Sequence, residues 1–123
     1  MGCENFIRIL FHMANSIKLY HWQTKSFARH KATCELFANI TSLTDQFVEV
    51  YMGRYSRPSF PKGIEFRVEE LSDNSAKILL KEFSDFLRTE LTKCLKSSDT
   101  DLFALRDDIL GEINKTMYLF TLS

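Results

Sequence analysis

The sequence predicts an all-α fold, a four-helix bundle in which two helical hairpins are joined by a long crossover loop over about residues 54–72. Eleven Phe residues, with only four Gly and two Pro, are typical of a compact helical core with few tight turns. Apolar residues recur at three- and four-residue steps in four separate stretches. The one stretch rich in helix breakers, residues 53–63, divides the chain into near-equal halves, so each half is expected to form one hairpin.

The first half is expected to hold helices over about 4–24 and about 27–53. The stripe of the first helix consists of Phe6, Leu10, Met13, Ala14, Ile17 and His21. The stripe of the second consists of Leu36, Phe37, Ile40, Leu43, Phe47, Val50 and Tyr51. Gly53 is placed to end the second helix as a left-handed C-terminal cap.

The second half is expected to hold two further helices. Asp73 or Asn74 can cap the third, whose stripe consists of Ala76, Leu79, Leu80, Phe83, Leu87, Leu91 and Cys94. Ser98 or Asp99 can cap the fourth, whose stripe consists of Leu102, Leu105, Ile109, Ile113 and Phe120. One short link in each half and one long link in the middle give the connectivity of ferritin-like bundles.

One charged residue interrupts each of the last two stripes, Glu90 in the third helix and Arg106 in the fourth. We expect them to form a buried ion pair, because buried charges are normally paired. At 123 residues the chain is expected to be a single domain, 1–123, since no second hydrophobic core fits.

The overall charge disfavours several classes of partner. The 16 basic and 16 acidic residues cancel, and there is no basic arm, so nucleic acid is not expected as a ligand. No apolar run reaches the roughly 18 residues of a membrane span, and the N-terminus lacks a secretion signal. A soluble, cytoplasmic protein is therefore expected, placed in the host cytoplasm or the virion if the source is viral.

The three cysteines, Cys3, Cys34 and Cys94, are odd in number and widely spaced. No two of them form a Cys-x-x-Cys pair, which favours reduced thiols that act as small core or surface residues. The start of the chain allows acylation of Gly2 or Cys3, but Phe6 stands where the usual Ser or Thr of a myristoylation signal would be.

Four side chains capable of binding metal lie within one apolar-patterned stretch of 29 residues: His21, His30, Asp45 and Glu49. Iron and zinc accept imidazole and carboxylate together, and the carboxylates neutralise the metal charge. His21 falls within the first apolar stripe, whereas His12 falls on the opposite, solvent-facing side. On the second helix, the other three share one shoulder of the apolar stripe with Cys34, where a neighbouring subunit could reach.

Bland alternatives exist for each of these residues. Asp45 and Glu49, one helical turn apart, can be ordinary solvated carboxylates, and His21 can be a core histidine bonded to a backbone carbonyl. The second half of the chain offers no matching set. The sequence contains no Glu-x-x-His, so a di-iron centre of the usual kind within one bundle is not expected.

The first two helices resemble the Dps-like branch of the ferritin superfamily, which comprises iron-storage and DNA-protection proteins that assemble into shells. His21-Trp22-Gln23 is similar to the family's His-Trp-Asn motif, and His30 is similar to its second histidine. Asp45-x-x-x-Glu49 is similar to the family's Asp-x-x-x-Glu. The chain is most similar to short members found in phages and large DNA viruses.

The resemblance implies a metal site shared across a two-fold axis, with histidines from one subunit and carboxylates from its mate. Iron is the expected metal, with zinc or no metal as alternatives. Trp22, Cys34 and Glu35 are candidates to surround the ligands, and packing is the default role of Trp22. Two features depart from the family: Cys34 replaces a further aspartate, and the gap from His21 to His30 is shorter.

Two functions follow as hypotheses. The first is a Dps-like metal-binding protein, at least a two-fold dimer, that sequesters or oxidises Fe(II) and would then be a ferroxidase-type oxidoreductase. The second is a non-catalytic structural protein, such as a minor component of a viral shell. In that role the loop over 54–67, rich in Arg and aromatic residues, would dock onto other shell proteins.

Overall fold

The structure, a computed structural model, describes residue 3 and residues 5–122, and that part of the chain is all-helical without any strand. The helices are α1 (Asn5–Gln23), α2 (Phe27–Arg54), α3 (Asp73–Arg88) and α4 (Thr100–Phe120), and a short 3-10 helix η1 (Thr92–Cys94) follows α3. The all-α prediction is confirmed, and the first two helices have nearly the predicted limits. The prediction that Gly53 ends the second helix as a left-handed cap is wrong, because α2 continues through Gly53 to Arg54. Among the described residues, the one with a positive φ is Gly63.

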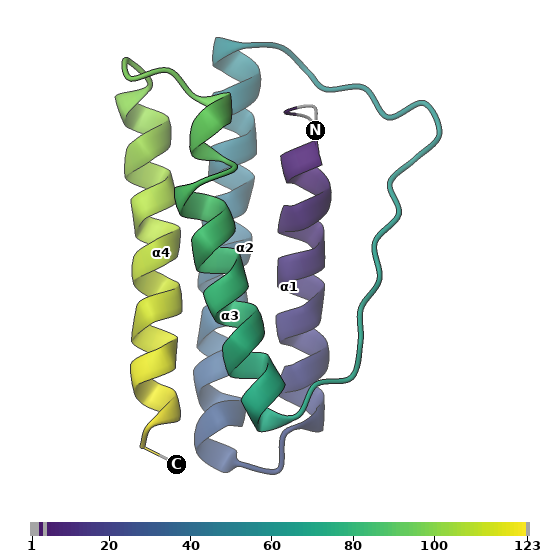
Figure 1. The fold of residues 1–123 in the computed structure, drawn as a ribbon, viewed down its shortest axis with the longest axis vertical. Helices are drawn as coiled ribbons and strands as arrows, with labels where there is room; N and C mark the ends of the chain where they lie inside the picture. Colours follow the sequence, from purple (N-terminus) through teal and green to yellow (C-terminus); the bar gives the residue numbers. More distant parts are fainter. Residues whose placement is uncertain (1–2, 4, 123) are drawn as a thin grey trace.

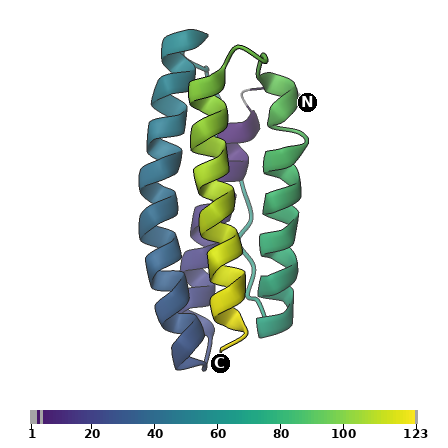
Figure 2. The same ribbon diagram turned by 90° about the vertical axis from the view of Figure 1, so that its left-hand side faces the viewer.

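The four helices lie side by side with their axes roughly aligned (Figures 1 and 2). In Figure 1, α1 runs downward and α2 returns upward. Residues 55–72, which we call the crossover, then descend along the outer side of α1 to the start of α3. α3 then runs upward and α4 downward. α2 packs against α1 and α4, and α3 also packs against α1 and α4.

The core lies between these helices and is formed by the apolar stripes that the sequence predicts. Phe6 of α1 packs edge-on against Phe47 and Tyr51 of α2, with ring centroids 5.7 and 4.8 Å apart. The side chains that are less than about 2% exposed include Phe6, Met13, Leu36, Ile40, Phe47, Leu87, Leu91, Leu102, Ile109 and Ile113. Burying each large aliphatic or aromatic side chain contributes roughly 1.5–3 kcal/mol, so these residues dominate the stability of the fold.

The cap of α3 lies one residue earlier than either predicted candidate. Ser72 accepts a hydrogen bond from the Ser75 backbone N–H at 3.1 Å, and the Ser75 hydroxyl accepts one from the Ser72 N–H at 2.8 Å. This reciprocal capping box satisfies two backbone donors at the helix start. The Asp73 carboxylate instead accepts a hydrogen bond from the Tyr20 hydroxyl at 2.6 Å, which connects α3 to the end of α1.

The predicted Glu90–Arg106 ion pair is wrong. α3 ends at Arg88, so Glu90 lies in the following turn, where it is exposed and pairs with Lys93 at 3.2 Å. Arg106 donates to the Thr92 hydroxyl at 2.8 Å and pairs with Asp107. The premature end of α3 thus separates the two charges that a longer helix would have brought together.

The prediction for His12 is also wrong. Its ring is half-buried and packs edge-on against Phe83 of α3, with the ring centroids 5.6 Å apart. The side of α1 opposite its main apolar stripe is therefore covered in part by α3. Periodicity within α1 could not show this, because the partner comes from a distant segment.

Two of the three cysteines are joined rather than reduced. Cys3 and Cys94 form a disulfide with their Cα atoms 5.6 Å apart, and it links the start of the described chain to η1. Cys34 is a free, exposed thiol, as predicted. The prediction of a cytoplasmic location rested in part on reduced thiols, and the Cys3–Cys94 disulfide removes that argument. Gly2, a candidate for acylation, lies outside the described residues. Across the part of the chain that is described, no helix combines the length and apolarity needed to cross a bilayer.

Candidate functional site

His21 and His30 form a reciprocal pair at the turn between α1 and α2. Their rings stack with centroids 3.9 Å apart and planes inclined by 19°. The Nδ1 atom of His21 lies 2.8 Å from the carbonyl oxygen of His30, and the Nδ1 atom of His30 lies 2.9 Å from the carbonyl oxygen of His21. A carbonyl oxygen can only accept, so each Nδ1 carries the proton and donates it.

Each Nδ1–H is thereby engaged, so Nε2 is the nitrogen of each ring through which a metal could bind. Neither Nε2 makes a hydrogen bond with a described residue. The pKa of His21 is lowered, chiefly because burial disfavours the charged ring and also because His30 and Lys18 repel a positive charge. An Nδ1–H bonded to a carbonyl is the usual way in which proteins fix a histidine so that its Nε2 can bind a metal.

Asp45 and Glu49 lie one turn apart on the exposed side of α2. The side chain of Asp45 raises the pKa of Glu49, first by a hydrogen-bonding contribution and then by its negative charge. The two carboxyl groups are therefore close enough to share a proton. A cation placed between them would relieve the same repulsion.

The histidines and the carboxylates do not meet within one chain. Asp45 follows His30 by 15 positions in α2, which places them about 22 Å apart along the helix axis. No group of three or more His, Cys, Asp or Glu side chains that could hold a metal is found in the described residues. His30 and Asp45 do share the exposed side of α2, since 15 positions rotate the helix by a net angle of only about 60°. The predicted site between two chains stays a prediction.

The candidate surrounding residues have separate environments. Trp22 is 67% exposed in the single chain, and the Lys18 ammonium lies 5.4 Å from its ring centroid, so its predicted role beside a site between chains stays a prediction. Cys34 is exposed one turn after His30. Glu35 pairs with Lys115 of α4 at 2.9 Å, so its carboxylate connects two helices.

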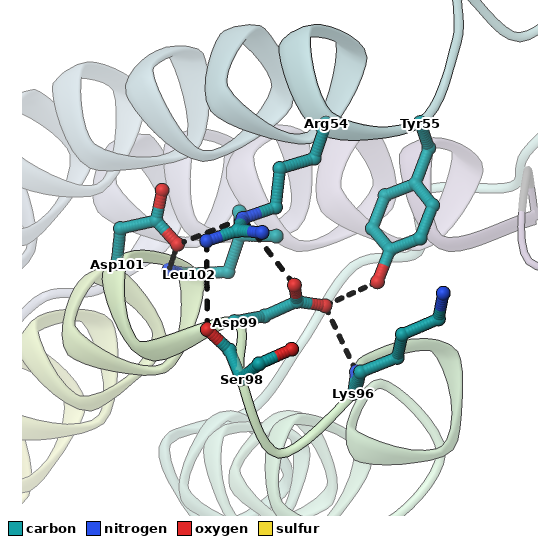
Figure 3. Close-up of polar contacts among 7 residues, drawn as sticks. All are labelled: Arg54, Tyr55, Lys96, Ser98, Asp99, Asp101 and Leu102. Carbon is teal, nitrogen blue, oxygen red and sulfur yellow. Dashed lines mark hydrogen bonds and ion pairs between the residues drawn. The ribbon is translucent and has the colours of Figure 1, made fainter.

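The sequence reasoning missed a buried carboxylate at the opposite end of the molecule (Figure 3). The Asp99 side chain is 2% exposed and accepts hydrogen bonds from the Tyr55 hydroxyl and, at 2.8 Å, from the Lys96 backbone N–H. Arg54 lies 3.3 Å from Asp99 and 3.2 Å from Asp101. The position of Asp99 before an apolar stripe was a signal for a cap, but its carboxylate binds the preceding turn and the end of α2 instead of the first turn of α4.

Most of the predicted docking loop over 54–67 has contacts within the chain. Phe60 and Ile64 are half-buried against the core, and Phe66 stacks on Phe11 of α1 with ring centroids 5.9 Å apart. Arg67 pairs with Glu69 at 3.2 Å. Arg57 makes no ion pair or hydrogen bond with a described residue. Docking of this loop onto another protein stays a prediction.

Comparison with known proteins gives one family and one relative. The profile described as "Family of unknown function (DUF5856)" matches residues 21–120. An uncharacterised 14.6 kDa protein from the mobD-ri intergenic region of Enterobacteria phage T4 is 30% identical over 107 residues, which cover 83% of this chain and 74% of the phage protein. No solved structure matches the chain.

Proposed function

The chain belongs to the DUF5856 family, whose function is unknown, and from its own residues we propose that it binds a divalent metal ion at a site shared by two copies. The observation that carries this proposal is the reciprocal His21–His30 pair. In both rings Nδ1 is engaged by a carbonyl oxygen and Nε2 has no hydrogen bond to a described residue, which is the orientation in which an imidazole can bind a metal.

A two-fold pairing of α2 with its copy would complete the ligand set. Two antiparallel α2 helices that cross near Ala38, an exposed and small residue midway between the two half-sites, bring the histidines of one copy opposite Asp45 and Glu49 of the other. Each dimer would then hold two equivalent sites, each with two imidazoles and two carboxylates.

Iron and zinc both fit such a ligand set, because imidazole suits either metal and carboxylates neutralise its charge. Of the two, only bound iron would support oxidation by oxygen or peroxide, and a role as a ferroxidase rests on that choice. The helix order with one long crossover supports a relationship to ferritin-like proteins, as does the His21-Trp22-Gln23 segment.

Complementation between two inactive variants tests the shared site. His30→Ala removes the histidine half, and Asp45→Asn combined with Glu49→Gln removes the carboxylate half. Each variant alone should lose Fe(II) and Zn(II) binding in calorimetry under argon. A purified heterodimer of the two should regain about half of the wild-type sites, because one of its two sites then receives an intact half from each chain.

Asp108→Asn, which changes an exposed carboxylate on α4, is the matched control and should bind metal like the wild type. A heterodimer that regains no sites would contradict a site between chains. Unchanged metal binding in both parent variants would contradict these ligands altogether. Peroxide added to the Fe(II)-loaded protein then distinguishes oxidation from binding alone.

A structural role in assembly is the second candidate. Four large apolar side chains are strongly exposed: Trp22 and Phe27 beside the first turn, and Tyr118 and Leu122 near the end of α4. Exposed apolar groups of this size are typical of surfaces that contact other proteins, and the phage source of the T4 relative is compatible with a viral assembly. Replacing Trp22 and Phe27 by Ser should then reduce the mass of the assembly in sedimentation without changing metal binding by the remaining species.

A further inference from the structure

An open apolar cavity of about 690 Å³ lies between α1, α2 and the crossover. Ligand sites in proteins usually enclose about 300–1,000 Å³, so its size suits one small molecule. Leu10 of α1, Phe37, Val48 and Met52 of α2, and Phe60 and Ile64 of the crossover are among its lining residues. We call this cavity the crossover groove.

The crossover is held so that it forms the outer wall of the groove. Phe66 stacks on Phe11 with ring planes only 5° apart, which attaches the crossover to α1. A turn closed by the Gly63 N–H bond to the Phe60 carbonyl, at 2.9 Å, lies between the two wall residues Phe60 and Ile64. Gly63 has φ of 79°, a left-handed conformation that other residues rarely adopt. A long loop with this degree of organisation is frequently functional.

The polar groups of the groove are mostly engaged within the protein. The Asn15 amide donates to the Phe11 carbonyl at 2.8 Å, and the Thr44 hydroxyl donates to the Thr41 carbonyl at 3.3 Å. Asp45 lies beside Glu49 and raises the pKa of its carboxyl group. Arg57 is the cation among the lining residues, and its guanidinium makes no ion pair or hydrogen bond with any described residue.

We propose that the crossover groove binds an anionic amphiphile of the long-chain carboxylate class. The apolar chain would lie along the aliphatic and aromatic lining, and the carboxylate would receive the two parallel hydrogen bonds that a guanidinium can donate. Asp45 disfavours an anion in the middle of the groove, so the head group lies at the Arg57 end. This inference requires no bound metal, although Asp45 belongs to both the groove and the proposed metal site.

Dodecanoate, kept below its micelle concentration, is the probe, and calorimetry is the measurement. Wild-type protein should bind about one dodecanoate per chain, and dodecyltrimethylammonium should bind at least tenfold more weakly. Arg57→Ala should weaken dodecanoate binding at least tenfold while leaving the binding of uncharged dodecanol unchanged. Lys62→Ala is the matched control, because Lys62 is an exposed cation of the same crossover that does not line the groove.

A second variant tests the apolar part of the groove. Ala14→Leu places a larger side chain into the lining and should weaken both dodecanoate and dodecanol, whereas Ala104→Leu on the exposed side of α4 should weaken neither. Circular dichroism and thermal unfolding verify that both variants fold. Absence of dodecanoate binding, equal binding of the cationic probe, or insensitivity to Arg57→Ala overturns the proposal. One further outcome would overturn it: a dimer that is dissociated by Ala14→Leu but not by dodecanoate. In that case the occupant of the groove is a second copy of the chain.

Discussion

At the scale of single residues, Asp99 is a buried carboxylate whose charge is compensated from three directions. The Tyr55 hydroxyl and the Lys96 backbone N–H donate to it, and the Arg54 guanidinium lies beside it (Figure 3). Removing a charge from water is costly unless it is paired and hydrogen-bonded, and here both conditions are met. These partners hold the pKa of Asp99 below its usual value, with the Tyr55 bond as the largest cause.

Acidification should therefore weaken the fold through Asp99. A carboxyl group whose pKa is lowered by folding contributes stability above its unfolded pKa, and that contribution disappears as the pH falls through the lower, folded pKa. We expect Asp99→Asn to be less stable than the wild type at neutral pH, and the difference to narrow between about pH 5 and about pH 2. Urea unfolding across this range measures both.

The exposed carboxyl group of Asp108 provides the control for this experiment. Asp108→Asn should follow the wild-type pH profile closely. A gap between wild type and Asp99→Asn that stays constant with pH would show that the carboxylate contributes through packing and not through its charge.

Some of these residue roles could be predicted from the sequence, and others could not. The burial of His21 could, because it depends on helical periodicity within α1, and its bond to a backbone carbonyl was an alternative that the sequence left open. Stacking on His30 could not, because it depends on how a three-residue turn aligns two helices. The partners of Asp99 lie at the end of α2, at the start of the crossover and in the turn before α4, and no local pattern reports such pairings.

At the scale of elements, the beginning of α3 depends on two serines. Ser72 and Ser75 satisfy each other's backbone N–H groups, which would otherwise lack partners in the first turn. This cap also fixes where the crossover ends and the helix begins. The second group of contacts at this helix start, between Tyr20 and Asp73, connects it to α1.

Ser72→Ala should lower the free energy of unfolding by about 1 kcal/mol, since it removes the acceptor for the Ser75 N–H. Ser72→Asp should retain most of the stability because aspartate caps helices equally well. Ser97→Ala, in an exposed turn, serves as the control and should change stability by less than about 0.5 kcal/mol. Chemical unfolding measures all three, and an unchanged Ser72→Ala would contradict the importance of the cap.

The existence of the four helices was predictable because each stripe is a local pattern, whereas three helix ends were not. Asp73 and Asn74 have the right chemistry for a cap, but a serine pair one residue earlier provides it. Gly53 lies at an exposed position one residue before the end of α2, and the helix continues through it to Arg54. α3 stops at Arg88 although the predicted stripe continues to Cys94, and Leu91 is still buried in the turn that leads into η1.

At the scale of the whole molecule, the Cys3–Cys94 disulfide joins the two halves of the chain. It closes a loop across a sequence separation of 91 residues. A cross-link of this length restricts the unfolded chain strongly, so its loss should destabilise the protein by about 4 kcal/mol.

Cys3→Ser should therefore shift the urea midpoint well below that of the oxidised wild type. Dithiothreitol should lower the wild type to the same value and leave Cys3→Ser unchanged. Cys34→Ser, which removes the exposed free thiol, should unfold like the wild type in both conditions. Equal midpoints for oxidised and reduced wild type would contradict a stabilising disulfide.

The order of the four helices could be predicted better from the sequence than the disulfide that connects them. A breaker-rich middle and a short link between α1 and α2 restrict four helices to a small number of arrangements, whereas the link between α3 and α4, predicted to be short, spans residues 89–99 and contains η1. The disulfide could not be predicted, because spacing along the chain does not show that Cys3 and Cys94 meet in space. The proposed metal site and the crossover groove depend in the same way on contacts that only folding, or a second chain, brings together.

The disulfide also decides how the molecule responds to force. In the oxidised chain, residues 3–94 form a covalent ring that contains α1, α2 and α3, and α4 lies outside it. If the oxidised chain were pulled from its two ends, only about 100 Å of extended polypeptide could be released, mostly from α4. A reduced chain would release about 400 Å. The three helices within the ring would carry no tension until the sulfur–sulfur bond was reduced.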